Sequence, residues 1–340
     1  MSNIDYAGIE VSKDKLLVVL KRNGRVLKGK EFSNTKKGHK AICRHLFRDG
    51  RVARAVMEAT GVYGLDLAIA LSKKDGIEVM VVNPQVSRDF HRAMFVRSKN
   101  DKLDCGVLLE FAERMEFRPF IPPSETAYAL RSMTREIDAL KRDCARAKCR
   151  LHAVGSTATS PKIVIRSLEK TIREQTKAIE KLARAAMALI AVDMILERRF
   201  ELLQTVPGAA EVSATMLIGE LATVPDFLTA RQLAAYAGLD PVEHKSGTSV
   251  NARKGISRRG NKRLRRALFM VALTAVRVDE HVKAFHEKLI ARGKKPIQAL
   301  VAVMRKLLHS IWGMFRSDTP FDGARFYRLE LNNEIITDKV

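Results

Sequence analysis

Apolar and polar residues alternate in short runs over the first third of the chain, and Gly, Asn and Ser separate the runs. This period of two predicts β-strands, and the pair Asn23-Gly24 is a strong signal for a hairpin turn between two of them. The predicted strands span residues 4–11, 15–21, 25–32, 53–57 and 77–82, and spacings of three and four predict helices at 36–47 and 62–73. An antiparallel meander followed by alternating strands and helices predicts an α/β domain over residues 1–118.

The middle of the chain has the pattern of two long helices. The Pro-rich stretch 118–123 cannot continue a helix, and two apolar seams with heptad spacing follow it, separated by residues 155–161. The seam positions are Leu130, Met133, Ile137, Leu140, Cys144, Ala147 and Leu151, then Leu168, Ile172, Gln175, Ile179, Leu182, Ala186 and Leu189. We expect an antiparallel coiled-coil hairpin over residues 119–199, whose charged outer face serves either solubility or oligomerisation.

Residues 200–340 form the third predicted region. Apolar helices at 269–276 and 297–315 predict an all-α core, in which Trp312 packs.

The composition indicates which kind of partner this protein binds. The chain has 340 residues, 46% of them hydrophobic, and 61 Lys and Arg against 38 Asp and Glu give a net charge of +23. We therefore expect folded domains and a polyanionic partner, although nucleoid and ribosomal proteins share that charge without being enzymes. The four cysteines lack zinc spacing, and no apolar run approaches about 18 residues, so we expect a protein of the bacterial cytosol or nucleoid with no membrane contact.

Four acidic residues are candidates for a metal site. Asp101 and Asp104 share one face at the start of a predicted helix, and Glu10 and Glu58 stand at the carboxyl ends of predicted strands. First-turn acids suit any helix, and strand ends are commonly solvated, so each residue alone has a structural explanation. Together, in a strongly basic protein, the four carboxylates favour a Mg²⁺ site that acts on nucleic acid.

A basic segment without any acid lies between His244 and Val278. Its Lys and Arg residues are Lys245, Arg253, Lys254, Arg258, Arg259, Lys262, Arg263, Arg265, Arg266 and Arg277. A few exposed bases are ordinary, but so many without a countercharge would repel one another, so we expect them to bind a phosphate backbone. Arg97 and Lys99, beside the acidic pair, are further candidates for nucleic-acid contacts.

These residues carry a resemblance to a known family. Tyr6-Ala7-Gly8-Ile9-Glu10, Glu58-Ala59-Thr60-Gly61, Val82-Asn83-Pro84, Lys99-Asn100-Asp101-Lys102-Leu103-Asp104, Val206-Pro207-Gly208, Gln232-Leu233-Ala234-Ala235-Tyr236-Ala237-Gly238-Leu239-Asp240-Pro241 and Ser246-Gly247-Thr248-Ser249 occur in the order found in Piv/MooV-type DNA invertases and insertion-sequence transposases. The resemblance covers nearly the whole chain. It implies a RuvC-like (ribonuclease-H-like) α/β domain, a coiled coil and an all-α C-terminal transposase domain. It also implies an acidic tetrad at Glu10, Glu58, Asp101 and Asp104, a nucleophilic serine at Ser246, and guidance by a bridge RNA.

The sequence offers other candidate residues for two of these roles, one for the first acid and one for the nucleophile. The family usually has Asp where this chain has Glu10, and Asp5 cannot substitute, because it lies at the far end of the strand and on its opposite face. Thr248 and Ser249 compete with Ser246 as the nucleophile, and a Ser-Gly turn is the structural explanation of that loop.

The sequence thus predicts an RNA-guided DNA recombinase that cleaves, exchanges and religates strands through a phosphoserine, assisted by Mg²⁺. Its predicted partners are donor and target DNA, a structured guide RNA and further copies of itself in a dimer or tetramer. Two alternatives stay open. One is a RuvC-like nuclease or resolvase in which water attacks the DNA, and the other is a non-catalytic architectural protein.

Overall fold

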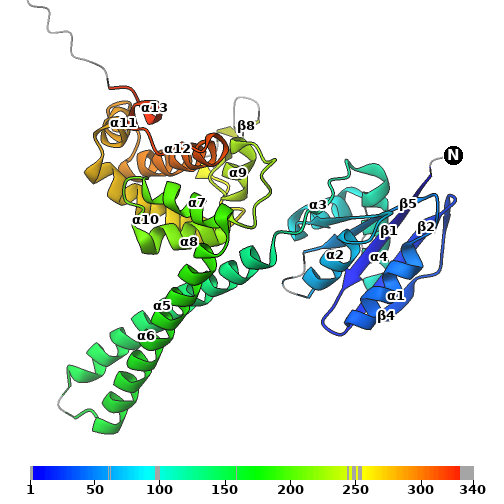
Figure 1. Ribbon diagram of the computed structural model, residues 1–340, viewed down its shortest axis with the longest axis horizontal. Coiled ribbons are helices and arrows are strands. Elements are labelled where there is room, and N and C mark those ends of the chain that lie inside the picture. The colour runs from blue at the N-terminus through cyan, green and yellow to red at the C-terminus, as the bar shows by residue number, and fades with distance from the viewer. Residues whose placement is uncertain are drawn as a thin grey trace, which may run out of the picture. The chain divides into compact units, whose positions relative to one another are not determined.

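The structure is a computed structural model of the chain. It describes residues 3–59, 61, 63–95, 100–157, 159–242, 245–246, 250–251 and 255–329. The chain divides into two compact units, Met1–Pro122 and Pro123–Val340, and the division falls in the Pro-rich stretch. The first unit contains the large sheet, and the second is mostly helical (Figure 1).

The first unit is built on a six-stranded mixed sheet. Its strands are β1 (Ile4–Val11), β2 (Lys15–Arg22), β3 (Arg25–Val26), β4 (Lys30–Ser33), β5 (Val52–Glu58) and β6 (Ile77–Val82). β1 pairs antiparallel with β2 and parallel with β5, and β6 extends the parallel part beyond β5. A meander followed by parallel strands is the order that the sequence predicts, and it is consistent with a ribonuclease-H-like domain.

The single strand predicted over residues 25–32 is wrong. β3 and β4 both pair with β2, but residues 27–29 between them belong to neither strand. Val26 and Leu27 are exposed there, so no buried face holds this part of the edge in one ladder.

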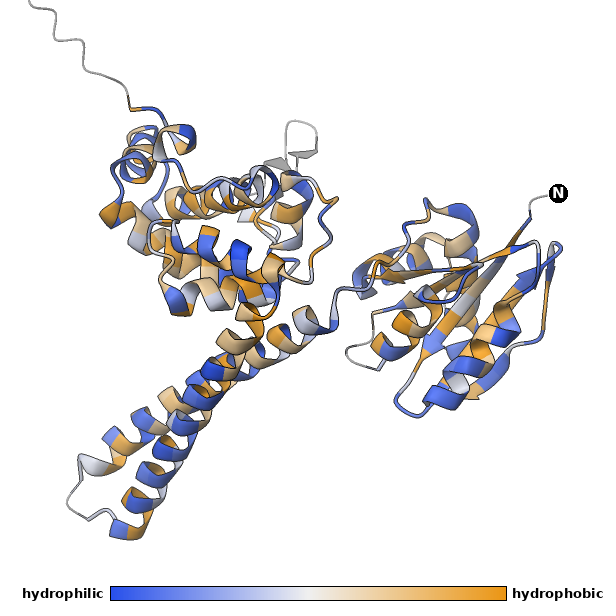
Figure 2. Ribbon diagram, in the orientation of Figure 1, coloured by the Kyte–Doolittle hydropathy of each residue, from blue (hydrophilic) through white to orange (hydrophobic). Residues whose placement is uncertain are grey.

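Helices cover both faces of the sheet. They are α1 (Lys36–Leu46), α2 (Leu65–Ser72), α3 (Pro84–Ala93) and α4 (Asp101–Arg114). Ile9 and Met57 point into the core under α1 and α2, whereas Val56 and Val82 point toward α3 and α4. The strands are therefore hydrophobic on both faces. Figure 2 shows hydrophobic residues along their ribbons.

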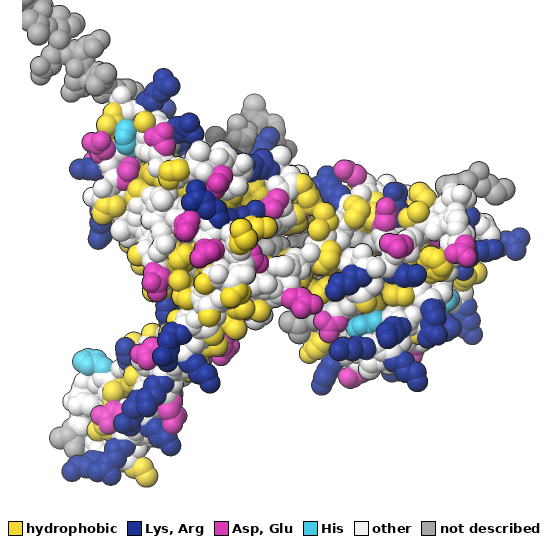
Figure 3. Space-filling model, in the orientation of Figure 1, with side chains coloured by type: hydrophobic (Ala, Val, Ile, Leu, Met, Phe, Trp, Pro, Cys, Tyr) yellow, Lys and Arg dark blue, Asp and Glu magenta, His cyan; other side chains and the backbone are white. Residues whose placement is uncertain are grey.

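Two long helices open the second unit. α5 (Glu125–Gly155) and α6 (Lys162–Ala191) lie side by side and run in opposite directions (Figure 1). The predicted seam positions are buried or half-buried, and Figure 3 shows many Lys and Arg side chains on the visible outer face of the pair. The helices lie where the sequence places them, and the supercoiled packing of a coiled coil stays a prediction.

The rest of the second unit is a helical core with short strand pairs. Its elements are α7 (Met194–Gln204), α8 (Glu211–Leu221), α9 (Ala230–Tyr236), β7 (Pro241–Val242), β8 (Lys245–Ser246), β9 (Val250–Asn251), β10 (Gly255–Ile256), α10 (Lys262–Val278), α11 (Glu280–Ala291), α12 (Pro296–Ser317) and α13 (Gly323–Phe326). Trp312 is buried in this core, as predicted. Of the helices that the structure describes, none has both the length and the apolar character needed to cross a membrane.

A buried carboxylate joins the long helices to this core. Glu220 of α8 is 2% exposed, and Arg135 of α5 donates to both of its oxygens at 2.8 Å. Asn261 donates to Glu220 at 2.6 Å and to the Tyr236 hydroxyl at 3.2 Å, while its own oxygen caps the start of α10. One carboxylate therefore links α5, α8, α9 and the first turn of α10.

This network also sets the charge state of Glu220. Burial raises the pKa of the Glu220 carboxyl, but hydrogen bonds from Arg135 and Asn261 outweigh burial, so the pKa lies below its ordinary value. Since the folded pKa lies below the unfolded one, the stabilisation is present above the unfolded pKa. It is lost as the pH falls through the folded pKa.

We expect Arg135→Leu to lower the free energy of unfolding by about 3 kcal/mol, because it leaves a buried carboxylate without its partner. Arg146→Leu is the matched control on the same helix, since it removes an exposed pair with Asp143 and should cost less than about 1 kcal/mol. Urea unfolding of both variants measures the difference. Equal losses would show that the Glu220 contact contributes no more than a surface pair.

Candidate functional site

The carboxyl end of the sheet carries the first two predicted acids. Ile9 pairs with Met57 across the parallel strands β1 and β5, so Glu10 and Glu58, each one residue further on, continue the same register. Side chains alternate along a strand, so both acids point to the face that α3 and α4 cover. The structure thus brings two half-buried carboxylates to one edge of one face.

The first turn of α4 carries the other two acids. The Asn100 side chain accepts a hydrogen bond of 2.9 Å from the main chain of this turn and fixes the start of the helix. Asp101 is exposed, and Asp104 is half-buried one turn further on. Asp101 and Glu10 line the same open cleft of about 420 Å³. Two of the four predicted acids therefore face one space large enough for part of a polynucleotide.

A glycine allows α4 to approach the strand so closely. A Cβ atom on Gly8 of β1 would collide with the carbonyl oxygen of Cys105 and would lie 2.6 Å from the amide nitrogen of Leu109. The helix backbone therefore rests directly on the strand backbone, two residues before Glu10. This contact sets the position of Asp101 and Asp104 relative to Glu10.

The thiol of Cys105 lies against the main chains of β1 and β2. It donates to the Gly8 carbonyl at 2.9 Å and to the Leu17 carbonyl at 3.3 Å. Burial raises the pKa of this thiol to about 12, and the charges of Glu10 and Asp104 add to the rise. Cys105 is therefore protonated and is no thiolate ligand, so the predicted ligands around it supply oxygen donors.

A half-buried imidazole lies beside Asp104. His91 of α3 places its Nε2 atom 3.4 Å from the Asp104 carboxylate, and within the described ranges this nitrogen has no hydrogen-bond partner. The position is too distant for a good hydrogen bond, so a polar group between or beside the two side chains would satisfy both. The sequence analysis missed His91, because its place in α3 gives no hint of a neighbour in α4.

The four acids do not form a closed metal cage. In the described part of the chain, no three His, Cys, Asp or Glu side chains gather closely enough to hold a metal ion. The donor set nevertheless fits a hard divalent cation, because it consists of carboxylates and the nearby thiol stays protonated. The unsatisfied His91 nitrogen is a second sign that a polar group belongs at this edge.

Asn34 holds together the loops that follow the two acidic strands. Its amide nitrogen donates to the carbonyls of Ser12 and Tyr63 at 2.9 and 3.0 Å, one in each loop. Its oxygen must therefore accept, so the Nε2 of buried His39, 2.8 Å away, carries the proton. Burial lowers the pKa of His39. Sequence reasoning missed both residues, since their role depends on contacts between loops far apart in the chain.

Asp5 has a structural role. It is 1% exposed at the amino end of β1, where Arg22 and Arg51 lie 2.6 and 2.7 Å from its two oxygens. Its side chain lies on the face opposite to that of Glu10. The expectation that Asp5 cannot replace Glu10 is confirmed.

The predicted basic residues of the second unit differ in their surroundings. Arg263 and Arg266 face Asp138 of α5 at 3.9 and 3.1 Å, so this part of the segment has a countercharge that the sequence analysis did not expect. Arg265 donates to the Ala237 carbonyl at 2.7 Å, and burial followed by the charge of Arg258 lowers its pKa.

Three exposed bases near the start of α10 have no acidic partner in the described part of the chain. Arg258, Arg259 and Lys262 are exposed, and they have no ion pair among the residues that the structure covers. They stand at the start of α10 and in the turn before it, where Arg258 has φ 53° and Gly260 has φ 153°. This turn is the part of the basic segment best placed to meet a phosphate backbone.

Several predicted residues lie outside the described ones. They are Arg97, Lys99, Arg253 and Lys254, together with the alternatives Thr248 and Ser249. The backbone of Lys245 and Ser246 forms β8, where Ser246 pairs with Val250, but their side chains are also outside the description.

Comparison with known proteins gives a consistent result. Residues 7–154 match a DEDD-type family from IS110 elements described as transposase, and residues 200–287 match the Transposase IS116/IS110/IS902 family. The pilin gene-inverting protein of Moraxella bovis is 29% identical over 270 residues, 78% of this chain and 81% of that protein. The transposases of IS1328 from Yersinia enterocolitica and IS1111A from Coxiella burnetii are each 25% identical, over 80% and 95% of this chain and 84% and 93% of their own lengths.

These matches, together with the strongly basic composition, define the protein as a DNA transposase. It belongs to the IS110/IS116/IS902 family, and the resemblance drawn from the sequence motifs is confirmed at the level of that family.

We expect Gly8→Ala to reduce recombination at least about 100-fold, because no side-chain movement can relieve the collision and α4 must shift with its acids. Gly106→Ala on the same helix is the control, since its Cβ would meet nothing within 4 Å and should leave recombination unchanged. Strand exchange between two plasmids measures both. Full activity of Gly8→Ala would show that the helix position does not control the site.

Proposed function

We propose that this transposase is an RNA-guided recombinase that exchanges DNA strands through a covalent bond to Ser246. The observation that carries the proposal is the cleft shared by Glu10 and Asp101, which α4 closes from one side. Family membership supports the use of DNA as substrate, and the excess of positive charge supports contact with more than one nucleic-acid strand. We also infer that the protein acts in the bacterial cytosol, where the chromosome lies.

The proposed chemistry conserves the phosphodiester bond. The Ser246 hydroxyl bonds to phosphorus while the bond from phosphorus to the leaving deoxyribose oxygen breaks, so the serine loses a proton and the leaving oxygen gains one. A hydroxyl from another strand then reverses the step and rejoins the DNA without ATP.

Glu10, Glu58, Asp101 and Asp104 would hold Mg²⁺ in this proposal. The ion supplies positive charge to the phosphate as negative charge develops on its oxygens. Glu10 in place of the usual Asp reaches one methylene further, which the open cleft can accommodate.

The basic residues divide into two groups in this proposal. Arg258, Arg259 and Lys262 would hold a phosphate backbone directly, as would Lys245, Arg253, Lys254, Arg97 and Lys99. Arg263, Arg265 and Arg266 would support that surface through their contacts to α5 and to the Ala237 carbonyl, while their remaining donors face the nucleic acid.

We expect Ser246→Ala to abolish the covalent protein–DNA adduct, which denaturing electrophoresis of end-labelled DNA detects. Ser249→Ala, three residues further along the chain, is the matched control and should keep the adduct. An adduct that persists in Ser246→Ala would overturn the assignment of the nucleophile. Cleavage by the wild-type protein without any adduct would favour the hydrolytic nuclease instead.

The guide and the assembly can be tested together. Strand exchange cuts two duplexes, and each chain offers one Ser246 and one set of acids, so we expect a dimer or tetramer bound to RNA. Light scattering on the purified complex should give the mass of at least two chains plus nucleic acid, and ribonuclease treatment should remove site-specific recombination. Recombination that survives ribonuclease would contradict the guide.

A further inference from the structure

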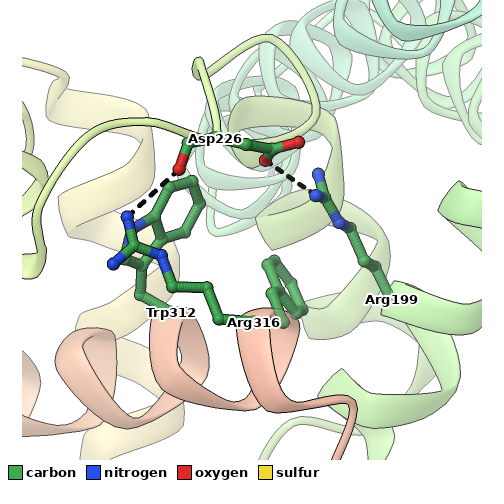
Figure 4. Close-up of a pocket in the computed structure, with 5 residues that line it drawn as sticks. Arg199, Asp226, Trp312 and Arg316 are labelled. Atoms are coloured by element: carbon green, nitrogen blue, oxygen red, sulfur yellow. Dashed lines mark hydrogen bonds and ion pairs between the residues drawn. The ribbon is translucent and has the colours of Figure 1, made fainter.

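A second, smaller pocket lies in the second unit, between α7, α12 and the loop that leads from α8 to α9. Its volume is about 200 Å³, and its lining residues are Arg199, Asp226, Trp312, Phe315 and Arg316. Figure 4 shows the two arginines and the two rings converging below Asp226. None of the residues predicted to act in strand exchange contributes to it.

Four hydrogen bonds hold the loop above this pocket. Arg316 donates to the carbonyls of Asp226 and Leu228 at 3.1 and 2.6 Å, and the Trp312 indole donates to the same Leu228 carbonyl at 2.6 Å. Arg199 donates to the Asp226 carboxylate at 2.7 Å. Both neighbours of Phe227 are therefore fixed.

Phe227 itself is presented to solvent. Its side chain is 61% exposed at the tip of a tight turn that the Leu228 amide closes onto the Pro225 carbonyl. Thr229 directly after the turn caps α9 in a capping box, so the loop is also fixed on its far side. An exposed aromatic ring on so firmly held a backbone loses little entropy when it contacts a ligand.

The pocket under this loop is positively charged. Arg199 and Arg316 outnumber Asp226, and the Nε and Nη1 atoms of Arg316 have no hydrogen-bond partner among the residues described. These donors suit a phosphate oxygen, while the face of a phenylalanine ring suits a nucleobase. A ring at a loop tip can stack only on a base that is not already enclosed in a duplex.

We propose that Phe227 and Arg316 form a binding site for one unpaired nucleotide of a single-stranded nucleic acid. The base stacks on the Phe227 ring, and its phosphate binds the free donors of Arg316. The site rests on the proposed nucleic-acid function of this transposase, but it is separate from the serine chemistry.

The chain contains a single tryptophan, and this tryptophan lines the pocket. Trp312 fluorescence therefore serves as a probe of this pocket. We expect a short oligothymidylate or oligouridylate, added to the full chain in EDTA, to change the Trp312 emission, and the tighter of the two identifies the strand. Because EDTA prevents cleavage, the result does not depend on whether Ser246 forms an adduct.

Variants of Phe227 separate stacking from other contacts. Phe227→Ala and Phe227→Leu should each weaken oligonucleotide binding by roughly 5- to 100-fold, since neither keeps a ring, whereas Phe227→Tyr should bind like the wild type. Val212→Ala, at another exposed apolar residue of the same unit, is the control and should have no effect.

Three results would overturn the proposal. One is unchanged Trp312 emission at saturating oligonucleotide, and another is wild-type affinity in Phe227→Leu. The third is a Phe227→Ala chain that binds normally but has a lower mass by light scattering, which would make the ring a contact between protein chains.

Discussion

The first unit depends on a contact between two backbones, where α4 crosses β1 at Gly8. No side chain separates the helix from the strand, so the radii of main-chain atoms alone set their distance. Glu10 follows Gly8 by two residues on the strand, and Asp101 precedes Cys105 by one turn on the helix. Both acids therefore reach the same cleft. Asn34 adds a second restraint by tying the loops after β1 and β5 to each other. Main-chain packing thus sets where the acids lie.

The second unit has a comparable restraint of a different chemical kind. Glu220 has exchanged water for Arg135 and Asn261, and Asn261 in turn supplies the cap of α10. The start of the basic helix and the long helix α5 therefore share one carboxylate. Asp138 strengthens the same connection, since it faces Arg263 and Arg266 across the two helices. Movement of α5 about its axis would carry the basic turn with it.

The sequence alone correctly predicted features that depend on the spacing of apolar residues within one strand or helix. The alternation along β1 correctly separates Glu10 from Asp5, and the heptad spacing predicts the buried side of α5. The sequence did not predict contacts between residues that lie far apart in the chain. Asp138 precedes Arg266 by 128 residues, so the basic segment looked free of countercharge. Asn34 and His91 have ordinary surroundings in sequence, and only the fold brings them to the acids. The strand 25–32 failed because its exposed edge lacks a buried face.

The burial of Cys105 affects how the first unit responds to oxidation. Oxidants and alkylating electrophiles react with thiolates, and the Cys105 thiol is kept protonated by burial and by the charges of Glu10 and Asp104. The charges of Glu10 and Asp104 therefore help to keep the neighbouring sulfur in its unreactive, protonated form. A buried, protonated thiol resists sulfenic acid formation, so the close packing of α4 on β1 should persist under oxidising conditions.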